Sequence, residues 1–290
     1  MYDFIVSANL NQLQQWAGRS ETQTEQVTAA PLAALNATLD REPWEPRSGD
    51  VVPPCWHWLY FLPLSRQSQL GVDGHPRRGE FLPPVPLPRR MWAGSRIEFL
   101  QPIYVGQSIA RKSKIVSVSG KDGRSGPLVF VSVRHEISTA QGVAIVEDQD
   151  IVYREISQQR TAPTACQVAP ADEQFSRKIT PDPVLLFRYS ALTFNGHRIH
   201  YDRPYAMTEE DYPGLVVHAP LIATLLIGEL TCKHPQVRVT AFACKALNPL
   251  FDTAPFTVCG RRDSALATLW ACGPQGLAMH ATATLIEKKR

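Results

Sequence analysis

Five polar residues stand close together between positions 195 and 202 of this chain: Asn195, His197, Arg198, His200 and Asp202. Apolar residues flank them on both sides. An imidazole can act as an acid or a base near neutral pH, and a nearby amide or carboxylate can hold water or a proton. A second run, Tyr-Pro-Gly-Leu-Val-Val-His-Ala-Pro-Leu, follows at positions 212–221. Together these runs favour an active site over a surface loop.

The stretch from Tyr189 to Ala206 resembles the signature of the (R)-specific enoyl-CoA hydratases, which belong to the MaoC-like hotdog superfamily. That signature runs from an aromatic residue through Gly-Asp-x-Asn-Pro to an aliphatic residue, a His and a later Ala or Ser. The residues that fit it are Tyr189, Leu192, Thr193, Ile199, His200 and Ala206. The departures are Phe194 in place of Gly, Asn195 in place of the catalytic Asp, and His197-Arg198 in place of Asn-Pro.

The run Phe-Asn-x-His-Arg-Ile-His-Tyr-Asp at positions 194–202 looks like one subgroup of that superfamily. The subgroup contains the mesaconyl-CoA, methylfumaryl-CoA and itaconyl-CoA hydratases and the related mitochondrial 3-hydroxyacyl-thioester dehydratases. The run 71–99, with Gly-His-Pro-Arg-Arg-Gly, is similar to the same subgroup, so the resemblance covers most of the chain. It implies an α+β double hotdog, in which two antiparallel sheets each wrap around a central helix, and an acyl-CoA substrate.

Hydration of an enoyl thioester requires a base for water, a proton for the α-carbon and an oxyanion hole. We predict that His200 transfers protons; the alternative is a hydrogen-bonded structural histidine. Asn195 cannot be a base, because an amide does not accept a proton, but it can hold the attacking water. Its alternative is a turn, because Asn195 precedes Gly196 and Asn-Gly is a strong turn dipeptide.

Other residues of the two runs could complete the catalytic and substrate-binding groups. Asp202 could supply the missing carboxylate, or could cap a helix that begins just after it. Gly214 could donate its backbone N–H to a thioester enolate, or act as a turn glycine, and these roles are compatible. Tyr189 and His218 are assigned to substrate binding, although His218 could equally cap the central helix.

A dicarboxylic acyl group, such as mesaconyl or itaconyl, carries a free carboxylate, which a bidentate guanidinium binds well. Arg198 is one candidate, and its alternative is a surface ion pair. Arg89 and Arg90 are further candidates, for this carboxylate or for the CoA phosphates. His197 and His200 have the spacing of metal ligands, but no third ligand stands nearby in sequence, so we expect no metal. We expect no cofactor either, because CoA is part of the substrate.

Two helices are predicted from apolar periodicity. The segment 220–230 is apolar on nearly all sides, so it must be buried, as the central helix of a hotdog is. Its N-terminal amides and the positive end of its dipole could stabilise a thioester enolate. The segment 31–39 begins with a proline, which suits a first helical turn.

Alternation of apolar and polar residues predicts two sets of strands. They cover 95–99, 109–118, 128–137 and 143–153 in the first half, and 237–246, 256–261, 265–271 and 276–286 in the second. The motif Gln101-Pro-Ile-Tyr104 recurs as Asn248-Pro-Leu-Phe251, which indicates duplication. We therefore expect an N-terminal hotdog domain over 1–160 with substrate and CoA contacts, a linker within 158–173, and a C-terminal hotdog domain over 170–290 with the hydratase motif.

Composition places the chain among globular proteins of about two domains. It has 290 residues, of which 44% are hydrophobic and 20% charged, and a net charge of +3. This small charge, without a basic stripe, disfavours nucleic-acid binding. Six cysteines without a Cys-x-x-Cys spacing are typical of reduced thiols. The chain shows no signal-peptide pattern, and its longest apolar stretch, 219–227, is too short to cross a membrane, so we expect a cytoplasmic protein.

The resemblance to the hydratase signature implies an enoyl-CoA hydratase, a carbon–oxygen lyase. The resemblance implies a branched C5 unsaturated dicarboxylyl-CoA ester, most simply itaconyl-CoA, converted through mesaconyl-CoA to citramalyl-CoA. The alternatives are a 3-hydroxyacyl-thioester dehydratase of fatty acyl metabolism, a non-catalytic acyl-CoA-binding hotdog protein, and a hotdog thioesterase. A homodimer of double-hotdog chains can form, because the sheet edges stay open.

Overall fold

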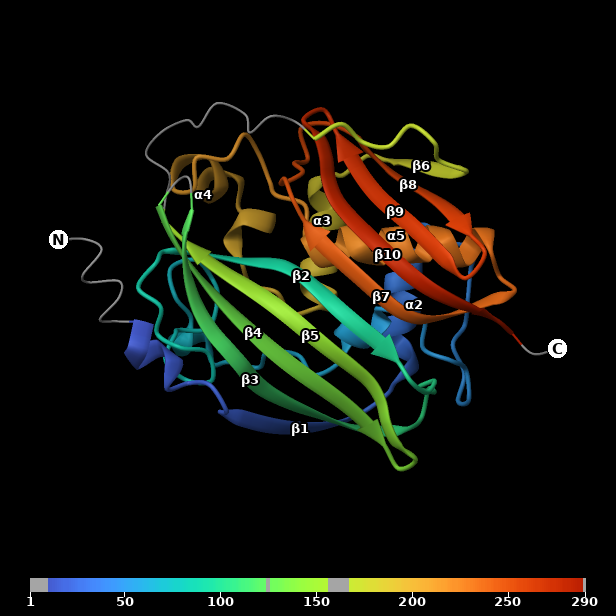
Figure 1. The fold of residues 1–290 in the computed structure, drawn as a ribbon, viewed down its shortest axis with the longest axis horizontal. Coiled ribbons are helices and arrows are strands. Elements are labelled where there is room, and N and C mark those ends of the chain that lie inside the picture. The colour runs from blue at the N-terminus through green and yellow to red at the C-terminus, as the bar shows by residue number, and fades with distance from the viewer. Residues whose placement is uncertain (1–9, 124–125, 156–166, 289–290) are drawn as a thin grey trace.

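The computed structural model describes residues 10–123, 126–155 and 167–288, and its labelled strands form one antiparallel sheet (Figure 1). The strand order is β1-β3-β4-β5-β2-β7-β10-β9-β8-β6. The first half contributes β1 (Ser20–Gln26), β2 (Arg89–Phe99), β3 (Ser108–Gly123), β4 (Gly126–Thr139) and β5 (Gly142–Arg154). The second half contributes β6 (Phe175–Ile179), β7 (Val237–Ala246), β8 (Phe256–Asp263), β9 (Leu266–Gly273) and β10 (Gly276–Glu287). Each half therefore forms five consecutive strands of the sheet.

The two halves meet where β2 pairs with β7. Ser95 lies opposite Cys244, and Ile97 lies opposite Phe242. At Gly94 the strands approach so closely that a Cβ atom would stand 2.2 Å from the carbonyl oxygen of Cys244, so a side chain has no room there. This pairing joins the two expected sheets edge to edge into one. Residues 156–166, where the predicted linker begins, lie outside the described residues.

The repeated proline motif has the same structural setting in both halves. Tyr104, which ends the first copy, forms an isolated antiparallel bridge with Val51. Phe251, which ends the second copy, forms the corresponding bridge with Val216. The sequence repeat is therefore also a structural repeat, as duplication predicts.

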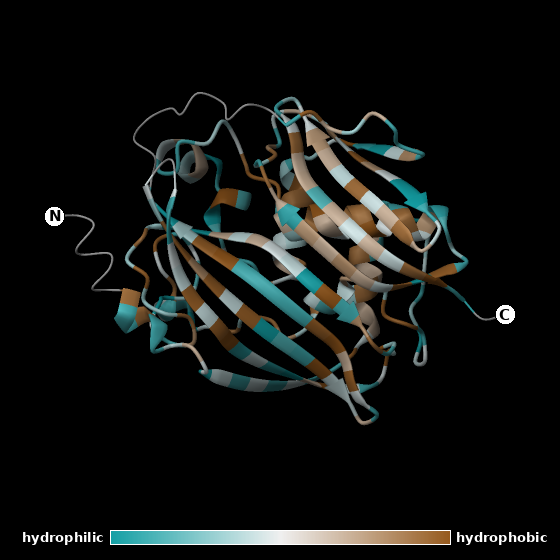
Figure 2. Ribbon diagram, in the orientation of Figure 1, coloured by the Kyte–Doolittle hydropathy of each residue, from teal (hydrophilic) through white to brown (hydrophobic). Residues whose placement is uncertain are grey.

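Helix α5 (Ala219–Lys233) is the central helix of the C-terminal half. It packs against β6, β7, β8, β9 and β10. Nine of its residues are buried, which is why the segment is apolar almost all round (Figure 2). A fully buried leucine contributes about 1.5–3 kcal/mol, so α5 holds much of this half together.

The N-terminal half has no helix of this kind among the described residues. Helix α2 (Ala29–Thr38) packs against α3 (Pro183–Leu192) and η1 (Trp56–Leu59) rather than mainly on the sheet. Just after the Val51 bridge, where α5 would begin in the second half, the chain makes only the single 3-10 turn η1. Cys55 and Phe61, which flank this turn, both have positive φ angles, a conformation that stops a helix.

The double hotdog is confirmed, with one refinement: a long central helix fills only the C-terminal half. In the N-terminal half, the chain after η1 runs irregularly to residue 88, with one further turn, η2 (Gln67–Gln69). Two strands were not predicted. One of them, β1, is entirely polar, and pairing with β3 rather than burial forms it.

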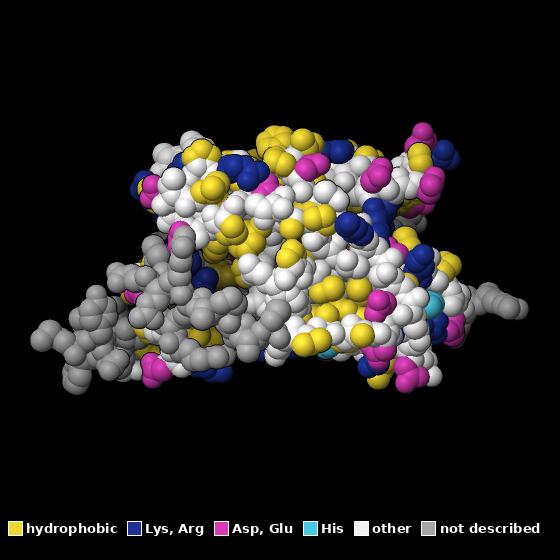
Figure 3. Space-filling view, turned by 90° about the horizontal axis from the view of Figure 1, so that it is seen from above, with side chains coloured by type: hydrophobic (Ala, Val, Ile, Leu, Met, Phe, Trp, Pro, Cys, Tyr) yellow, Lys and Arg dark blue, Asp and Glu magenta, His cyan; other side chains and the backbone are white. Residues whose placement is uncertain are grey.

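On the face of the molecule shown in Figure 3, hydrophobic side chains lie in groups among charged ones. No described helix is long and apolar enough to cross a membrane. The cysteines of the described residues are free thiols, as expected: Cys55, Cys232, Cys244, Cys259 and Cys272.

Candidate active site

The polar motif begins directly after helix α3. Asp182 caps α3 by accepting a hydrogen bond from the Leu185 N–H, and Pro183 suits the first turn. After the helix ends, Phe194 has a φ angle of +50°, a left-handed conformation that favours glycine. The family signature has glycine at this position. Phe194 therefore has a backbone conformation that a glycine at this position would adopt easily, although the residue differs.

His200 ends the short turn η3 (Arg198–His200) and is buried. Its Nδ1 lies 2.7 Å from the carbonyl oxygen of Val216, so Nδ1 carries the hydrogen and Nε2 keeps a lone pair. Burial lowers the pKa of His200 to about 4. The imidazole is thus neutral at pH 7 and can accept a proton through Nε2.

His218 stacks on His200, with ring centroids 3.7 Å apart and an interplanar angle of 18°. Its Nε2 lies 2.8 Å from Oγ of Ser190, and its Nδ1 is buried without a partner in the described structure. His218 occupies the N-cap position of α5, but its side chain makes no capping hydrogen bond. Burial lowers the pKa of His218 well below its ordinary value, so this ring is neutral too.

Asn195 forms the predicted turn and also lines the cavity beside the motif. Its Oδ1 accepts a hydrogen bond from the His197 N–H at 3.0 Å. The same side chain is part of the cavity wall. The two interpretations of Asn195 are therefore geometrically compatible.

Asp202 and Arg198 form an ion pair, and Arg198 also lines the cavity. Oδ1 of Asp202 accepts a hydrogen bond from the Tyr205 N–H and so caps helix α4 (Arg203–Thr208). This is the helix-cap role, one of the two alternatives predicted for Asp202. Its Oδ2 accepts from Nε and Nη2 of Arg198, at 2.9 and 2.7 Å. Nη1 of Arg198 donates to the carbonyl oxygen of Val72 at 3.1 Å. Arg198 thus fastens the motif to the N-terminal half.

Gly214 lies in a buried loop five residues before α5. A Cβ atom at this position would stand 2.7 Å from Oδ1 of Asp252 and from Cγ2 of Thr253. The same Oδ1 accepts the N–H of Leu215 at 2.9 Å, and Asp252 also pairs with Arg203. Gly214 is therefore fixed by close packing, and it is not part of the cavity wall.

The two neighbouring arginines of β2 differ in their surroundings. Nε of Arg89 lies 2.8 Å from Oε2 of Glu210, and the guanidinium stacks over Tyr212 at 5.0 Å. Arg90 lines the cavity, and no ion pair of Arg90 occurs among the described residues. Tyr189 lines the same cavity, and burial raises the pKa of its hydroxyl.

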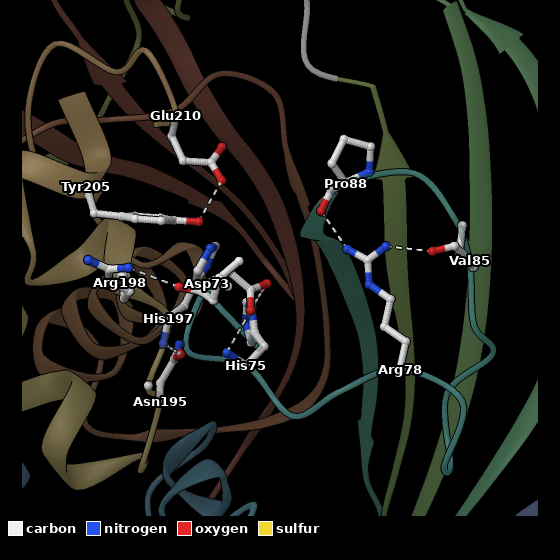
Figure 4. A network of polar contacts seen from close by, with 12 residues as sticks. Asp73, His75, Arg78, Val85, Pro88, Asn195, His197, Arg198, Tyr205 and Glu210 are labelled. Atoms are coloured by element: carbon white, nitrogen blue, oxygen red, sulfur yellow. Dashed lines mark hydrogen bonds and ion pairs between the residues drawn. The ribbon is translucent and has the colours of Figure 1, made fainter. Parts of the chain in front are cut away.

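Two site residues that sequence reasoning missed come from the loop 71–79 of the N-terminal half (Figure 4). Oδ2 of Asp73 lies 3.1 Å from Nδ1 of His75, and Oδ1 of Asp73 accepts the His75 N–H at 3.0 Å. The ring of His75 lies 4.0 Å from the ring of His197. The run Gly-His-Pro-Arg-Arg-Gly marked this loop in the sequence, but nothing there indicated which distant residues it meets.

The loop is held against the motif by backbone contacts. The Arg198 N–H donates to the carbonyl oxygen of Asp73 at 2.9 Å. Gly74 has a φ angle of +83°, and a Cβ atom there would stand 1.9 Å from the carbonyl oxygen of Gly196. Glycine is thus required at position 74, and its absence of a side chain allows the two halves to touch.

The site opens into a cavity of about 1100 Å³. Its wall includes Ser190 and Asn195 from the C-terminal half and His75, Arg90 and Arg111 from the N-terminal half. Pro220, in the first turn of α5, also lines it. The cavity therefore lies between the two halves, on the side where the N-terminal half lacks a long central helix.

A series of imidazoles leads from the cavity wall inward. His75 lines the cavity, and the rings then follow in the order His75, His197, His200 and His218, with centroids 4.0, 5.5 and 3.7 Å apart. Burial and the charge of Arg90 together lower the pKa of His75 to about 4, against the opposing effect of Asp73. Burial and the neighbouring histidines also lower the pKa of His197. All four rings are neutral at pH 7.

A smaller cavity of about 320 Å³ adjoins the first and shares Trp58, Arg111 and Gln149 with it. Its wall includes the buried carboxylate of Glu147, which lies 3.1 Å from Nε2 of His57. Glu147 also accepts hydrogen bonds from Trp58 and Ser95. This part of the cavity therefore combines a charged group with a wall that is mostly apolar.

Asp73, His75 and His197 each offer an atom within 4.8 Å of the others, a grouping that could hold a metal ion. The sequence disfavoured a metal because His197 and His200 lacked a third ligand nearby. The tertiary structure supplies two such groups to His197 from the other half, so that reason no longer holds. The nearby charge of Arg90, which lowers the pKa of both histidines, opposes a cation here.

Comparison with known proteins identifies the family. The model of the family "hydroxyacyl-thioester dehydratase type 2" matches residues 55–252. The chain is 48% identical, over 271 residues, to mesaconyl-C(4)-CoA hydratase of Chloroflexus aurantiacus, which covers 93% of this chain and 96% of that protein.

Solved structures share the fold. A MaoC-like dehydratase superposes with a TM-score of 0.71 at 13% identity, covering 94% of this chain and 98% of the other. A Mycobacterium tuberculosis protein described as a double hotdog superposes with a TM-score of 0.56 at 12% identity, covering 93% and 96%. The chain is thus a double-hotdog enzyme that belongs to the type 2 hydroxyacyl-thioester dehydratase family.

Proposed function

We propose that this enzyme hydrates a branched C5 unsaturated dicarboxylyl-CoA ester. Mesaconyl-CoA, activated at the carboxyl group farther from the methyl branch, would take up water to give citramalyl-CoA. Itaconyl-CoA would enter by migration of its double bond to give mesaconyl-CoA. The 48% identity to a mesaconyl-C(4)-CoA hydratase over nearly the whole chain supports this substrate class.

The observation that carries the proposal is the guanidinium of Arg90 in the cavity wall, which lies beside the Tyr153 hydroxyl and has no carboxylate partner among the described residues. Arg89 and Arg198 are both engaged by carboxylates of the protein, Glu210 and Asp202. Arg90 is close enough to His75 and His197 to lower the pKa of both. In mesaconyl-CoA of this form the free carboxylate sits on the β-carbon, so its cation must lie next to the proton-transfer groups. Arg90 meets that requirement.

His200, which lies behind His197 and is not itself part of the cavity wall, is the proposed base for the attacking water. Its Nδ1–H donates to Val216, which fixes the ring and leaves the Nε2 lone pair to take a proton as the oxygen bonds to the β-carbon. Asn195, in the cavity wall, can accept a hydrogen bond from the same water. Mutation of a group that transfers a proton in the transition state typically costs 10²–10⁴-fold in rate.

The enolate of the thioester would form at the start of α5. Pro220 places the first turn of this helix in the cavity wall. A helix N-terminus carries a partial positive charge and unpaired N–H groups, which stabilise a developing oxyanion. This end of α5, rather than Gly214, is the part of the proposed oxyanion hole that contacts the cavity.

The same groups can serve the double-bond migration of itaconyl-CoA. The thioester acidifies the α-protons, and loss of one gives the enolate that the helix N-terminus stabilises. Return of a proton to the terminal methylene carbon then gives mesaconyl-CoA. Both steps need an imidazole that is neutral at rest, as the rings of the site are.

The test is mass-resolved turnover of itaconyl-CoA, mesaconyl-CoA and crotonyl-CoA by the wild type and by Arg90→Gln. We expect one water to be gained on the C5 dicarboxylyl esters, and kcat/KM on mesaconyl-CoA to fall at least 100-fold in the variant. Crotonyl-CoA lacks the carboxylate, so any turnover of it should hardly change. Arg96→Gln, an exposed arginine of the same strand, is the matched control.

Turnover of crotonyl-CoA alone would instead indicate dehydration of fatty acyl thioesters. Release of free thiol would indicate a thioesterase, and binding without any turnover would indicate an acyl-CoA-binding protein.

A further inference from the structure

Hydration requires a second proton transfer that the motif of the C-terminal half does not account for. After water adds to the β-carbon, a proton must reach the α-carbon. The family signature has a catalytic aspartate where this chain has Asn195, and an amide cannot transfer that proton. Asp202, the other carboxylate of the motif, caps α4 and pairs with Arg198. The second group must therefore come from elsewhere in the cavity wall.

The loop 71–79 brings a carboxylate and an imidazole to this place. The Asp73 carboxylate holds Nδ1 of His75, so Nδ1 carries the hydrogen and Nε2 is the atom left to exchange a proton. His75 lines the cavity, as do Asn195 and Arg90. An imidazole oriented by a carboxylate through Nδ1 is the arrangement that stabilises a transient imidazolium in many enzymes.

We propose that His75, oriented by Asp73, is a further catalytic residue that delivers the proton to the α-carbon. This inference deepens the proposed hydration and rests on it for the identity of the substrate. His75 acts on the carbon, whereas His200 acts on water. Asp73 is a positioning residue, because it acts through His75.

The protons balance without any other reactant. The oxygen of water bonds to the β-carbon, the π electrons move onto the thioester as an enolate, and the water proton passes to His200. His197, whose ring lies beside both others, would take that proton at one nitrogen and pass the proton of its other nitrogen to His75. The C–H bond then forms at the α-carbon, His75 loses the proton, and all three imidazoles are neutral again. His197 is left in its other tautomer, and proton exchange with water restores the first.

The electrostatics of His75 suit such a donor. Burial and Arg90 lower its pKa to about 4, so its imidazolium is a strong acid that gives its proton readily to an enolate. The Asp73 carboxylate opposes this shift, which keeps the charged form accessible for the short time in which it is needed. Its own pKa is lowered to about 2, because bonding to His75 outweighs burial, so it is ionised throughout.

Exchange of α-protons isolates this step from water addition. A saturated C5 dicarboxylyl-CoA ester cannot lose water, but its α-protons can exchange with deuterium in D₂O, which mass spectrometry follows. We expect His75→Asn to slow both exchange and hydration by about 10²–10⁴-fold. His280→Asn, which changes an exposed histidine of β10, should alter neither rate.

Asp73→Asn tests the positioning role separately. The amide cannot stabilise the imidazolium, so we expect kcat to fall about tenfold with little change in KM, and the acid limb of the pH–rate profile to move. Thermal unfolding of each variant shows whether it is folded, and His75→Gln provides a second variant if His75→Asn is not.

Three results would overturn the assignment. The first is α-proton exchange in both His75 variants within threefold of the wild type. The second is one tightly bound metal ion per chain whose chelation abolishes activity, because Asp73, His75 and His197 would then be ligands. The third is loss of exchange in His280→Asn. If the wild type hydrates crotonyl-CoA but no C5 ester, the proposed substrate fails, and α-exchange of butyryl-CoA still tests His75.

Discussion

The two halves of this molecule have the same strand order but use the space inside the sheet differently. In the C-terminal half a 15-residue helix fills it, and the helix start carries His218. In the N-terminal half a four-residue turn stands at the corresponding point, and the loop after it supplies Asp73 and His75. In one copy of the repeated unit a core helix fills the inside of the sheet, whereas in the other a cavity and its wall occupy the corresponding space.

The buried histidines of the two halves differ in the same way. His200 has a free Nε2 and leads to the cavity through other imidazoles. His57 is bound to Glu147, which also accepts hydrogen bonds from Trp58 and Ser95. The first arrangement leaves a lone pair for chemistry, and the second satisfies a buried charge.

The largest expected effect separates these two histidines. His200→Asn should lower kcat for hydration by about 10²–10⁴-fold while leaving the unfolding temperature nearly unchanged. His57→Asn should do the reverse, because Glu147 loses a partner in a buried site, at a cost of about 1–3 kcal/mol. Steady-state kinetics and thermal unfolding of both variants check this. Equal losses of activity would mean that the halves are not specialised as described.

The packing of the central helix gives the next prediction. Leu226→Ala in α5 should lower the free energy of unfolding by about 2–5 kcal/mol, because the residue is fully enclosed. Leu59→Ala in η1 should lie at the lower end of that range, because this turn has a cavity beside it into which neighbours can relax. Urea unfolding measures both. A larger loss at Leu59 would contradict the view that the N-terminal half is less tightly filled.

A third prediction concerns the contact between the halves. Gly74→Ala would force the loop away from Gly196, and a misplacement of about 1 Å at a catalytic group can cost 100-fold in rate. Gly79→Ala is the matched control, because Gly79 also has a positive φ angle, but its nearest neighbour to a Cβ atom is Pro84 at 3.6 Å. Similar kinetics for the two variants would show that backbone strain, not the contact, matters.

The smallest effects concern pH. The folded-state pKa of His200, about 4, lies below its ordinary value of 6.5, so the unfolded state binds more protons between these values. Stability should therefore fall as the pH drops from 6.5 toward 4, and activity should fall near pH 4 as the base is protonated. Thermal unfolding and pH–rate profiles measure this, and His200→Asn should show a shallower decline in stability.

Glu147 should act in a lower pH range. Burial alone would raise its pKa, but the hydrogen bond and charge of His57 lower it to about 2, from 4.5. Its stabilising contribution is therefore present above pH 4.5 and is lost as the pH falls toward 2. Glu147→Gln should make this second decline shallower, because Asp73 still titrates in the same range, and should leave the one between pH 6.5 and 4 unchanged. If both variants changed the stability over the same pH range, the view that His200 and Glu147 titrate in separate ranges would be contradicted.

Much of the fold was predictable because its causes are local. Period-two alternation gave the strands β3, β4, β5 and β7 to β10 nearly at their observed bounds, and the all-round apolar segment gave α5. Strand β1 was missed because its side chains are polar and no apolar alternation marks it. The turn η1 was not predicted as a break in the core helix, because the positive φ angles that end it are fixed by tertiary packing.

The residues of the site can likewise be separated into those that local sequence identified and those that only the tertiary structure brought together. The sequence alone determined the motif around His200, the repeat, the central helix and the family, because each is carried by residues that are close in the chain. Only the tertiary structure decided which of the three candidate arginines lines the cavity without a carboxylate partner. It also decided that Asp202 caps α4, and that Asp73 and His75 lie beside His197. Asp73 and His75 lie over 120 positions from His197 in the chain. The pairing of β2 with β7, the close contact of Gly74 with Gly196 and the hydrogen bond from Arg198 to Val72 bring them together.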